Sequence, residues 1–354
     1  MPTSYADETW MLLDSRGIGG IESHVLHLAA GLQYRWGNVR VVFLENHGKH
    51  PLIERLDEEG ISWEHLNGTL RSLLAAMRRR PMLLHTHGYK AGILGRIAAL
   101  IRRVPVVSTF HAGEPGVGRV HLYNTLDLLT AGIGTSIAVS TPIKDRIPGP
   151  AHLVHNFVPV PNHPNGAKAP VIAFVGRLSH EKGPDLFCQL AAQVPNAPFA
   201  IYGDGPMRGA LEKRYGGDVF FKGEVSDMER HWGDIGLVCM PSRHEGLPYT
   251  VLEAMAHGIP VAAFGVGDLP RVIAHGQNGW LAAPGNIKEL ANHLRQWSTL
   301  ERGHLDEISA KARGTIRDQY STDAVIPRII RIYQETIANG AAKPTLGITG
   351  KTAC

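Results

Sequence analysis

Short apolar runs alternate with amphipathic helical stretches along most of this chain, and that alternation constrains the fold more than any other feature. An apolar stripe at helical spacing, from Ile21 to Leu32, follows the first run. Strands separated by helices pair in parallel, with helices covering both faces of the sheet. The strands expected in the first half are 10–13, 39–44, 82–86 and 104–109.

A proline-rich break at 158–170 interrupts the alternation, with four prolines and no apolar period. The alternation then restarts, and a chain of 354 residues is long for one core. We therefore expect an α/β protein with two Rossmann-like domains facing across a cleft. The expected order is a first domain 1–157, a linker 158–170, a second domain 171–318, a helix 319–338 that packs back on the first domain, and a disordered tail 339–354.

Composition indicates an ordinary globular protein, with 44% hydrophobic and 19% charged residues. We see neither a signal peptide nor an apolar run of membrane-spanning length. The three cysteines, Cys188, Cys239 and Cys354, are odd in number and lack the spacing of metal ligands. These features predict a cytoplasmic protein in a reducing compartment.

Two glutamates eight positions apart, Glu245 and Glu253, lie between two expected strands. Pro248 suits the first turn of a helix and Gly258 its end, so Glu245 lies on the entering loop and Glu253 about one and a half turns inside. Helical side chains lean toward the N-terminus, where free N–H groups attract anions. Carboxylates beside an anion site suit a ligand with both phosphates and hydroxyls, such as a sugar nucleotide.

Two cations, Arg177 and Lys182, follow an expected strand by two and seven positions. A guanidinium and an ammonium that converge on a cleft are natural partners for a diphosphate, and they would stabilise the charge on it as it departs. The alternative is a surface ion pair of either cation with Glu181 or Asp185.

These motifs resemble those of retaining GT-B glycosyltransferases of the family-4 type, the glycosyl transferases group 1. The resemblance implies that Glu245 contacts hydroxyls of the transferred sugar, Glu253 holds the nucleotide's ribose, and Arg177 with Lys182 grips the diphosphate. It is strong in the second domain and weaker in the first, as expected if the first binds a variable acceptor. It places at the donor Gly19, Gly20, Arg177, Lys182, Val225, Glu245, Gly246, Leu247, Pro248 and Glu253.

The glycine-rich loop that holds Gly19 and Gly20 fails as a dinucleotide fingerprint, because Glu22 stands where a third glycine is needed. It resembles the family's Gly-Gly-x-Glu turn, which faces the donor phosphate; a plain tight turn is the alternative. His111 ends an expected strand, and a lone histidine there is more often structural. The matching family position lies in the active site, so we assign His111 to the catalytic set with Arg177, Lys182 and Glu245.

We expect no metal site and no separate cofactor. Aspartates nowhere occur two positions apart, which speaks against a metal-chelating pair, and His85 with His87 lacks an evident third ligand. Asp268 and Arg271 stand where the family usually shows glycine and glutamate, and this puts the local loop shape in doubt.

Nine basic residues against one acid, Glu114, lie between Leu66 and Arg119. Such a patch could meet an anionic membrane face or a phosphate-bearing acceptor, or be only solvated helix ends. No aromatic interleaving points to nucleic acid. The nine are Arg71, Arg78, Arg79, Arg80, Lys90, Arg96, Arg102, Arg103 and Arg119.

We therefore expect a retaining glycosyltransferase that moves a hexose-type sugar from a UDP- or GDP-linked donor to a hydroxyl of a glycan or lipid-linked acceptor. The setting would be bacterial-type polysaccharide or glycolipid synthesis in the cytoplasm, with a possible contact at the cytoplasmic membrane face. The alternatives are a sugar-nucleotide epimerase or hydrolase on the same fold, or a non-catalytic nucleotide-sugar-binding protein.

Overall fold

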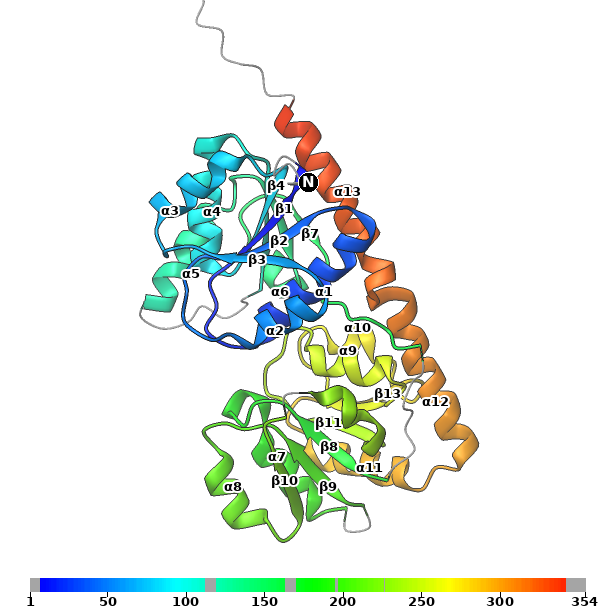
Figure 1. Cartoon of the computed structure of the whole chain (residues 1–354). Coiled ribbons are helices and arrows are strands. Elements are labelled where there is room, and N and C mark those ends of the chain that lie inside the picture. The colour runs from blue at the N-terminus through cyan, green and yellow to red at the C-terminus, as the bar shows by residue number, and fades with distance from the viewer. Residues whose placement is uncertain (1–6, 112–118, 163–169, 195–196, 226, 342–354) are drawn as a thin grey trace, which may run out of the picture. The chain divides into compact units, whose positions relative to one another are not determined.

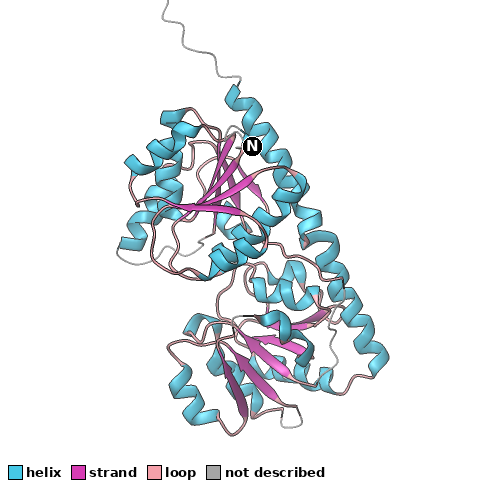
Figure 2. Cartoon of the chain, viewed as in Figure 1, coloured by secondary structure: helices cyan, strands magenta, loops and turns pink. Residues whose placement is uncertain are grey.

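The computed structural model describes residues 7–111, 119–162, 170–194, 197–225 and 227–341. The chain forms two compact units, each with one sheet and helices packed against it (Figure 1, Figure 2). The first unit takes in residues 1–138, 145–152 and 326–354, and the second takes in 139–144 and 153–325. Within the described residues, no helix is both long and apolar enough to cross a membrane.

The first unit holds a seven-stranded sheet in the order β3-β2-β1-β4-β5-β6-β7, with parallel pairing from β3 through β6. Every residue of β1, β4 and β5 is buried, because helices cover both faces of a parallel sheet. The strands are β1 (Thr9–Leu13), β2 (Val39–Phe43), β3 (Ser62–His65), β4 (Leu83–His87), β5 (Val106–Phe110), β6 (Thr135–Ala138) and β7 (Ala151–Leu153).

Most helices of the first half follow strands in alternation, as the apolar pattern predicts. Gly88 and the left-handed Arg103 bracket α4, which lies between β4 and β5. The helices are α1 (Gly20–Arg35), α2 (Pro51–Glu58), α3 (Leu70–Ala76), the short η2 (Met77–Arg79), α4 (Tyr89–Arg102), α5 (Arg119–Leu129) and α6 (Thr141–Lys144).

The second unit repeats this plan with a six-stranded parallel sheet in the order β10-β9-β8-β11-β12-β13. Separate apolar clusters, which contain Val251 and Phe187 respectively, form its core. The strands are β8 (Ile172–Val175), β9 (Phe199–Tyr202), β10 (Val219–Gly223), β11 (Leu237–Met240), β12 (Val261–Phe264) and β13 (Gly279–Ala282). The helices and turns are η3 (His180–Lys182), α7 (Pro184–Ala191), α8 (Arg208–Tyr215), η4 (Met228–Arg230), η5 (Trp232–Asp234), α9 (Tyr249–Ala256), α10 (Leu269–Val272), α11 (Ile287–Ser298), α12 (Arg302–Thr315) and η6 (Ile316–Tyr320).

The proline-rich stretch begins as ordered chain of the second unit. Val158 is 1% exposed, its N–H donates to Tyr320 at 3.0 Å, and its carbonyl accepts from Thr322 at 3.0 Å. Residues 163–169 lie outside the described part, so the ranges proposed for the domains and the linker stay a prediction.

The last helix, α13 (Thr322–Ala341), carries Pro327 inside it, and from Ile326 onward it belongs to the first unit. Its Tyr333 hydroxyl lies 2.6 Å from Nδ1 of His85 on β4, and Thr336 Oγ1 lies 2.8 Å from Thr135 Oγ1. Both histidine nitrogens are engaged, because Nε2 lies 2.7 Å from Thr109 Oγ1. His85 therefore has a structural role, in which it fixes α13 to the sheet.

Replacing Tyr333 with phenylalanine should destabilise the first unit by about 1–3 kcal/mol, because it leaves Nδ1 of the buried His85 without its partner. The control is Tyr34→Phe on α1, where the tyrosine is 87% exposed. Thermal unfolding of both variants measures the difference. Equal midpoints would contradict a stabilising role for this hydrogen bond.

Candidate functional site

In both sheets the strand order reverses beside the first strand, between β1 and β4 and between β8 and β11. At such a point the loops after the two strands turn to opposite faces and leave room for a ligand at their carboxyl ends. Each unit therefore has one place where the topology favours binding.

In the second unit, the loops after β8 and β11 bring together two of the predicted site residues. Lys182 Nζ donates to both carboxylate oxygens of Glu245, each at 2.8 Å. The Glu245 side chain is 4% exposed and that of Lys182 is 30% exposed. A nearly buried carboxylate is stable there because the ammonium compensates its charge.

Close backbone packing between these two loops sets this geometry. Gly183 has φ +71°, and a Cβ there would lie 2.2 Å from the Pro241 carbonyl oxygen, so the loops approach closely only with glycine. The Arg243 N–H also donates to the Glu181 carbonyl at 2.8 Å. These contacts place Lys182 opposite Glu245.

A paired guanidinium and carboxylate brace the same two loops. Nη1 and Nη2 of Arg243 lie 2.9 and 2.6 Å from the two oxygens of Asp185. Hydrogen bonding to Arg243 lowers the pKa of Asp185, and the same bond raises the pKa of Arg243. Asp185 thus pairs with Arg243. Among the described residues it forms no ion pair with Arg177 or Lys182, which was the alternative for this carboxylate.

Arg177 is exposed on the loop after β8, on the same loop as Lys182. The hydrogen bond from Ser179 lowers the pKa of Glu181, and the charges of Arg177 and Lys182 act in the same direction. Both cations therefore lie close enough to one carboxylate to act on it together.

Glu253 lies inside α9, one turn after Tyr249. Burial raises the pKa of Tyr249 well above its usual range, and the charge of Glu253 adds to the rise. The helix ends before Gly258, with φ +77°, as predicted, whereas Pro248 precedes the helix as its N-cap instead of lying in the first turn. The predicted placing of Glu245 before the helix and of Glu253 within it agrees with these bounds.

Asp268 holds the loop that carries Gly246. The Asp268 N–H donates to the Gly246 carbonyl at 3.0 Å, and its carboxylate accepts from the Thr141 N–H at 3.1 Å. Gly267, with φ +58°, lets the backbone pass close to Glu245, where a Cβ would meet the carbonyl oxygen at 2.2 Å. This departure from the family pattern therefore serves as a structural anchor.

The remaining donor residues of the second unit contribute backbone and shape. Leu247 is 3% exposed, and its carbonyl accepts from Asn156 Nδ2 at 2.8 Å. Val225, after β10, packs against the apolar core. Contact of Gly246, Leu247, Pro248 and Val225 with a nucleotide sugar stays a prediction.

In the first unit, Gly19 caps α1 in an extended conformation and Gly20 begins the helix; both are exposed after β1. A histidine cluster lies in the same unit. His111 Nε2, after β5, lies 3.2 Å from Nδ1 of His87 at the end of β4. The ring of His24 lies 4.8 Å from that of His111, centroid to centroid.

His24 was not among the site residues expected from the sequence. It lies one turn into α1, after the strand at the point of reversal, and this placement was the signal that could have found it. His24, His87 and His111 each offer one ring nitrogen, and the three nitrogens lie within 4.8 Å of one another, so the cluster could hold a metal ion. His85 lies outside this cluster, and the expectation of no metal site stays a prediction.

Burial keeps His87 and His111 neutral. It lowers the pKa of His87 well below its usual range, with further lowering by His85, His111 and His24. Burial, with His85 nearby, lowers the pKa of His111 to about 3. A neutral His111 keeps one N–H to donate, so it can act as a hydrogen-bond donor but not as a cation.

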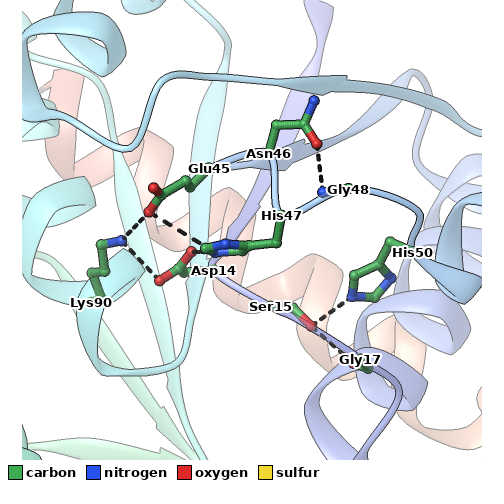
Figure 3. Close-up of polar contacts among 9 residues, drawn as sticks. All are labelled: Asp14, Ser15, Gly17, Glu45, Asn46, His47, Gly48, His50 and Lys90. Carbon is green, nitrogen blue, oxygen red and sulfur yellow. Dashed lines mark hydrogen bonds and ion pairs between the residues drawn. The ribbon is translucent and has the colours of Figure 1, made fainter.

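A second polar cluster lies where β1 and β2 end (Figure 3). Lys90 Nζ lies 2.8 Å from Glu45 and 3.1 Å from Asp14, and His47 Nε2 lies 3.0 Å from Asp14. Burial alone would lower the pKa of Lys90, but hydrogen bonds to Glu45 and Asp14 outweigh it and raise that pKa. Asp14, Glu45 and His47 could also hold a cation. Neither carboxylate was among the expected site residues, although each directly follows one of the strands expected from the sequence.

The nine basic residues do not form one patch. Arg96 is 1% exposed and pairs with Asp127, Arg79 pairs with Glu64, and Lys90 belongs to the cluster just described. The Arg119 side chain and Glu114 lie outside the described part. Four of the nine are exposed there: Arg71, Arg78, Arg80 and Arg103.

Comparison with known proteins gives two family matches. The model of "Glycosyltransferase Family 4" matches residues 18–160, and that of "Glycosyl transferases group 1" matches residues 169–299. The 2-deoxystreptamine glucosyltransferase of Streptomyces kanamyceticus is 29% identical over 67% of this chain and 73% of its own length. Sulfoquinovosyl transferase SQD2 of Arabidopsis thaliana is 31% identical over 45% of this chain, which spans only 32% of that protein.

Solved structures show the same fold. Anabaena Alr3699/HepE in complex with UDP-glucose superimposes with a TM-score of 0.80, at 20% identity, over 92% of this chain and 99% of that one. At this identity the likeness establishes the fold, GT-B with two Rossmann-like domains, and no residue's role.

The free energy of unfolding should fall as the pH drops below about 6.5. His111 then becomes protonated in the unfolded chain, whereas in the folded protein its lowered pKa keeps it neutral. Each such histidine contributes about 1.4 kcal/mol per pH unit, down toward its folded pKa. Thermal midpoints near pH 7.5 and near pH 5 measure this slope, and His111→Gln should show a smaller drop than the unaltered protein. An identical drop would mean that His111 is protonated in the fold.

Proposed function

Because the chain belongs to the group 1 glycosyltransferases of the GT-B fold, we propose that it moves a hexose-type sugar from a nucleoside diphosphate sugar to a hydroxyl of a glycan or lipid-linked acceptor. The observation that carries the proposal is the Lys182–Glu245 pair where the second sheet reverses. It joins, at one ligand-binding position, a cation suited to phosphate and a carboxylate suited to hydroxyls.

The diphosphate would lie against Lys182 and Arg177. An ammonium has three N–H donors, and Lys182 directs two bonds at Glu245, so one donor remains for a phosphate oxygen. Glu245 offsets much of the Lys182 charge. Arg177, exposed and free to present its planar fork, would therefore supply most of the attraction for the anion.

The sugar and the ribose would meet the carboxylates. Glu245, held by Lys182, would accept hydrogen bonds from hydroxyls of the transferred sugar, and Glu253 would hold the ribose. The HepE structure carries UDP-glucose, and this supports a nucleotide-linked hexose, UDP- or GDP-linked, as the donor. The first unit, whose motifs resemble those of the family less closely, would bind the acceptor.

The reaction would retain the anomeric configuration. The acceptor oxygen bonds to C1 on the face from which the diphosphate oxygen departs, and the hydroxyl proton passes to that departing oxygen. Arg177 and Lys182 would stabilise the charge of the leaving group, and neutral His111 would donate a hydrogen bond to the reacting groups. Such a reaction suits bacterial-type polysaccharide or glycolipid synthesis. Buried free thiols at Cys188 and Cys239 support a reducing, cytoplasmic setting.

A thermal-shift screen against a panel of UDP- and GDP-linked sugars tests donor binding. A donor that raises the midpoint is then incubated with glycan and lipid-linked acceptors, and the anomeric proton couplings of the product are measured by NMR. Retention supports the mechanism, and inversion would contradict it. Donor consumption that is independent of any acceptor would favour the epimerase or hydrolase alternative.

We predict that Arg177→Ala and Lys182→Ala each lower the transfer rate by about 10²–10³, because each removes a fixed charge from the departing diphosphate. Because Arg177 is exposed, Arg177→Ala should have the same melting temperature as the unaltered protein. Lys182→Ala should have a lower one, since it also leaves the nearly buried Glu245 carboxylate without its compensating charge. Lys213→Ala on α8, also exposed, is the matched control. Rates within threefold of the unaltered protein for both variants would refute the assignment.

We further predict transfer without a divalent metal ion, since Arg177, Lys182 and the N-terminus of α9 would face the phosphates of a bound donor. Activity in excess chelator should stay close to that in its absence. If activity vanishes and zinc, magnesium or manganese restores it, the prediction is wrong, and the cluster of His24, His87 and His111 becomes the first place to look for the ion.

A further inference from the structure

Exposed large apolar side chains gather on two neighbouring helices of the first unit. In the described part of the chain ten such side chains are exposed, and all but three, Ile18, Tyr34 and Phe220, lie on α4 and α5. Single exposed apolar residues are normal, but a cluster marks a surface that binds something. The clustered residues are Tyr89, Leu100, Ile101, Leu122, Tyr123, Leu126 and Leu129.

Contacts between α4 and α5 place the two helices side by side and running in the same direction. The rings of Tyr89 and Tyr123 stack at 5.5 Å, and Arg96 pairs with Asp127 further along. Leu100 lies one turn beyond Arg96, and Leu129 lies two residues beyond Asp127. The two leucines are therefore at the same end of the helix pair.

The stripe on α5 lies to one side of its contacts with α4. Leu122, Leu126 and Leu129, spaced four and three residues apart, are 58%, 39% and 73% exposed. Tyr123, Asp127 and Thr130 lie about a quarter turn around the helix and make its contacts with α4. This apolar stripe is thus left uncovered by the first unit.

Basic residues border the apolar side chains. Arg71, Arg78 and Arg80 are exposed on α3, on η2 and just after it, and Arg103 follows α4. The end of α4 is joined to α3, because Arg102 Nε donates to the Leu74 carbonyl at 3.0 Å. Residues 66–111 contain neither aspartate nor glutamate, and Asp127 is neutralised by Arg96. The face is therefore both apolar and positive.

We propose that this face docks on the surface of an anionic lipid bilayer. The apolar–basic face comprises Leu100, Ile101, Leu122, Leu126 and Leu129 with Arg71, Arg78, Arg80 and Arg103. The leucines enter the headgroup–acyl boundary, and the arginines meet the anionic headgroups. A second copy of the chain fits less well, since a symmetric pair would set arginines against arginines. The inference does not depend on the sugar chemistry.

Vesicle flotation with the full chain tests the proposal. The vesicles are phosphatidylcholine alone and phosphatidylcholine mixed with phosphatidylglycerol, at low and at high salt. Binding should be strong to the anionic vesicles and weaken with salt, because the screening length falls from about 10 Å at 0.1 M to about 3 Å at 1 M. Equal partitioning to both kinds of vesicle, or none, would overturn the proposal.

Two sets of substitutions separate the apolar from the ionic contribution. Leu122→Ser with Leu126→Ser and Leu129→Ser should lower partitioning at least about tenfold at either salt. Arg78→Gln with Arg80→Asn and Arg103→Asn should lower it roughly 100-fold at low salt only, at roughly fivefold a charge. Asparagine is chosen at 80 and 103 because φ is +54° and +56° there, a region that it tolerates.

Matched controls remove the same groups elsewhere. Tyr34→Ser with Phe220→Ser removes exposed apolar residues, and Lys213→Gln with Lys288→Gln and Lys311→Gln removes exposed charges. Both controls should bind like the unaltered protein. If the leucine variant melts early, the single changes Leu122→Ser and Leu129→Ser replace it, with about a severalfold loss expected from each.

Binding by the leucine variants equal to that of the unaltered protein would overturn the proposal. So would a dimer in sedimentation velocity that the leucine variants convert to monomers with vesicle binding unchanged, since the face would then be an interface between copies.

Discussion

Parallel pairing between β1 and β4 and between β8 and β11 is the constraint from which the functional geometry follows. Parallel strands require crossover connections, and these leave the loops of successive strands at one edge of each sheet. Where the order reverses, loops that are distant in sequence become neighbours. Lys182 and Glu245, 63 positions apart, meet for this reason, as do His24 and His87.

Much of this arrangement could be read from the sequence, because it depends on local pattern. Most of the buried strands of both sheets lie on apolar runs, and the glycines at 183 and 258 adopt the positive φ that such turns require. The strand β3 was not foreseen, since Ser62–His65 is a half-exposed edge with no apolar period. An edge strand of this kind forms because the neighbouring strand, here β2, offers backbone hydrogen bonds, and the sequence pattern does not reveal them.

Pairings across long stretches of chain were harder to foresee. The sequence placed Lys182 and Glu245 at one ligand but not in contact with each other, and the same holds for Asp185 with Arg243. For the basic residues between 66 and 119, the sequence suggested a grouping that the structure does not show. Charge counted along the sequence overstated the patch, because Arg79, Lys90 and Arg96 are each paired with a carboxylate from another segment.

The return of α13 to the first unit has a consequence for the order in which the protein is made. The contact between His85 and Tyr333 joins residues 248 positions apart, and everything between 153 and 325 belongs to the second unit. During synthesis the second unit can close as soon as its own residues have emerged from the ribosome. The first unit, although it is begun earlier, gains its last helix only after the second has been translated. Translation order and the order of completion are thus reversed.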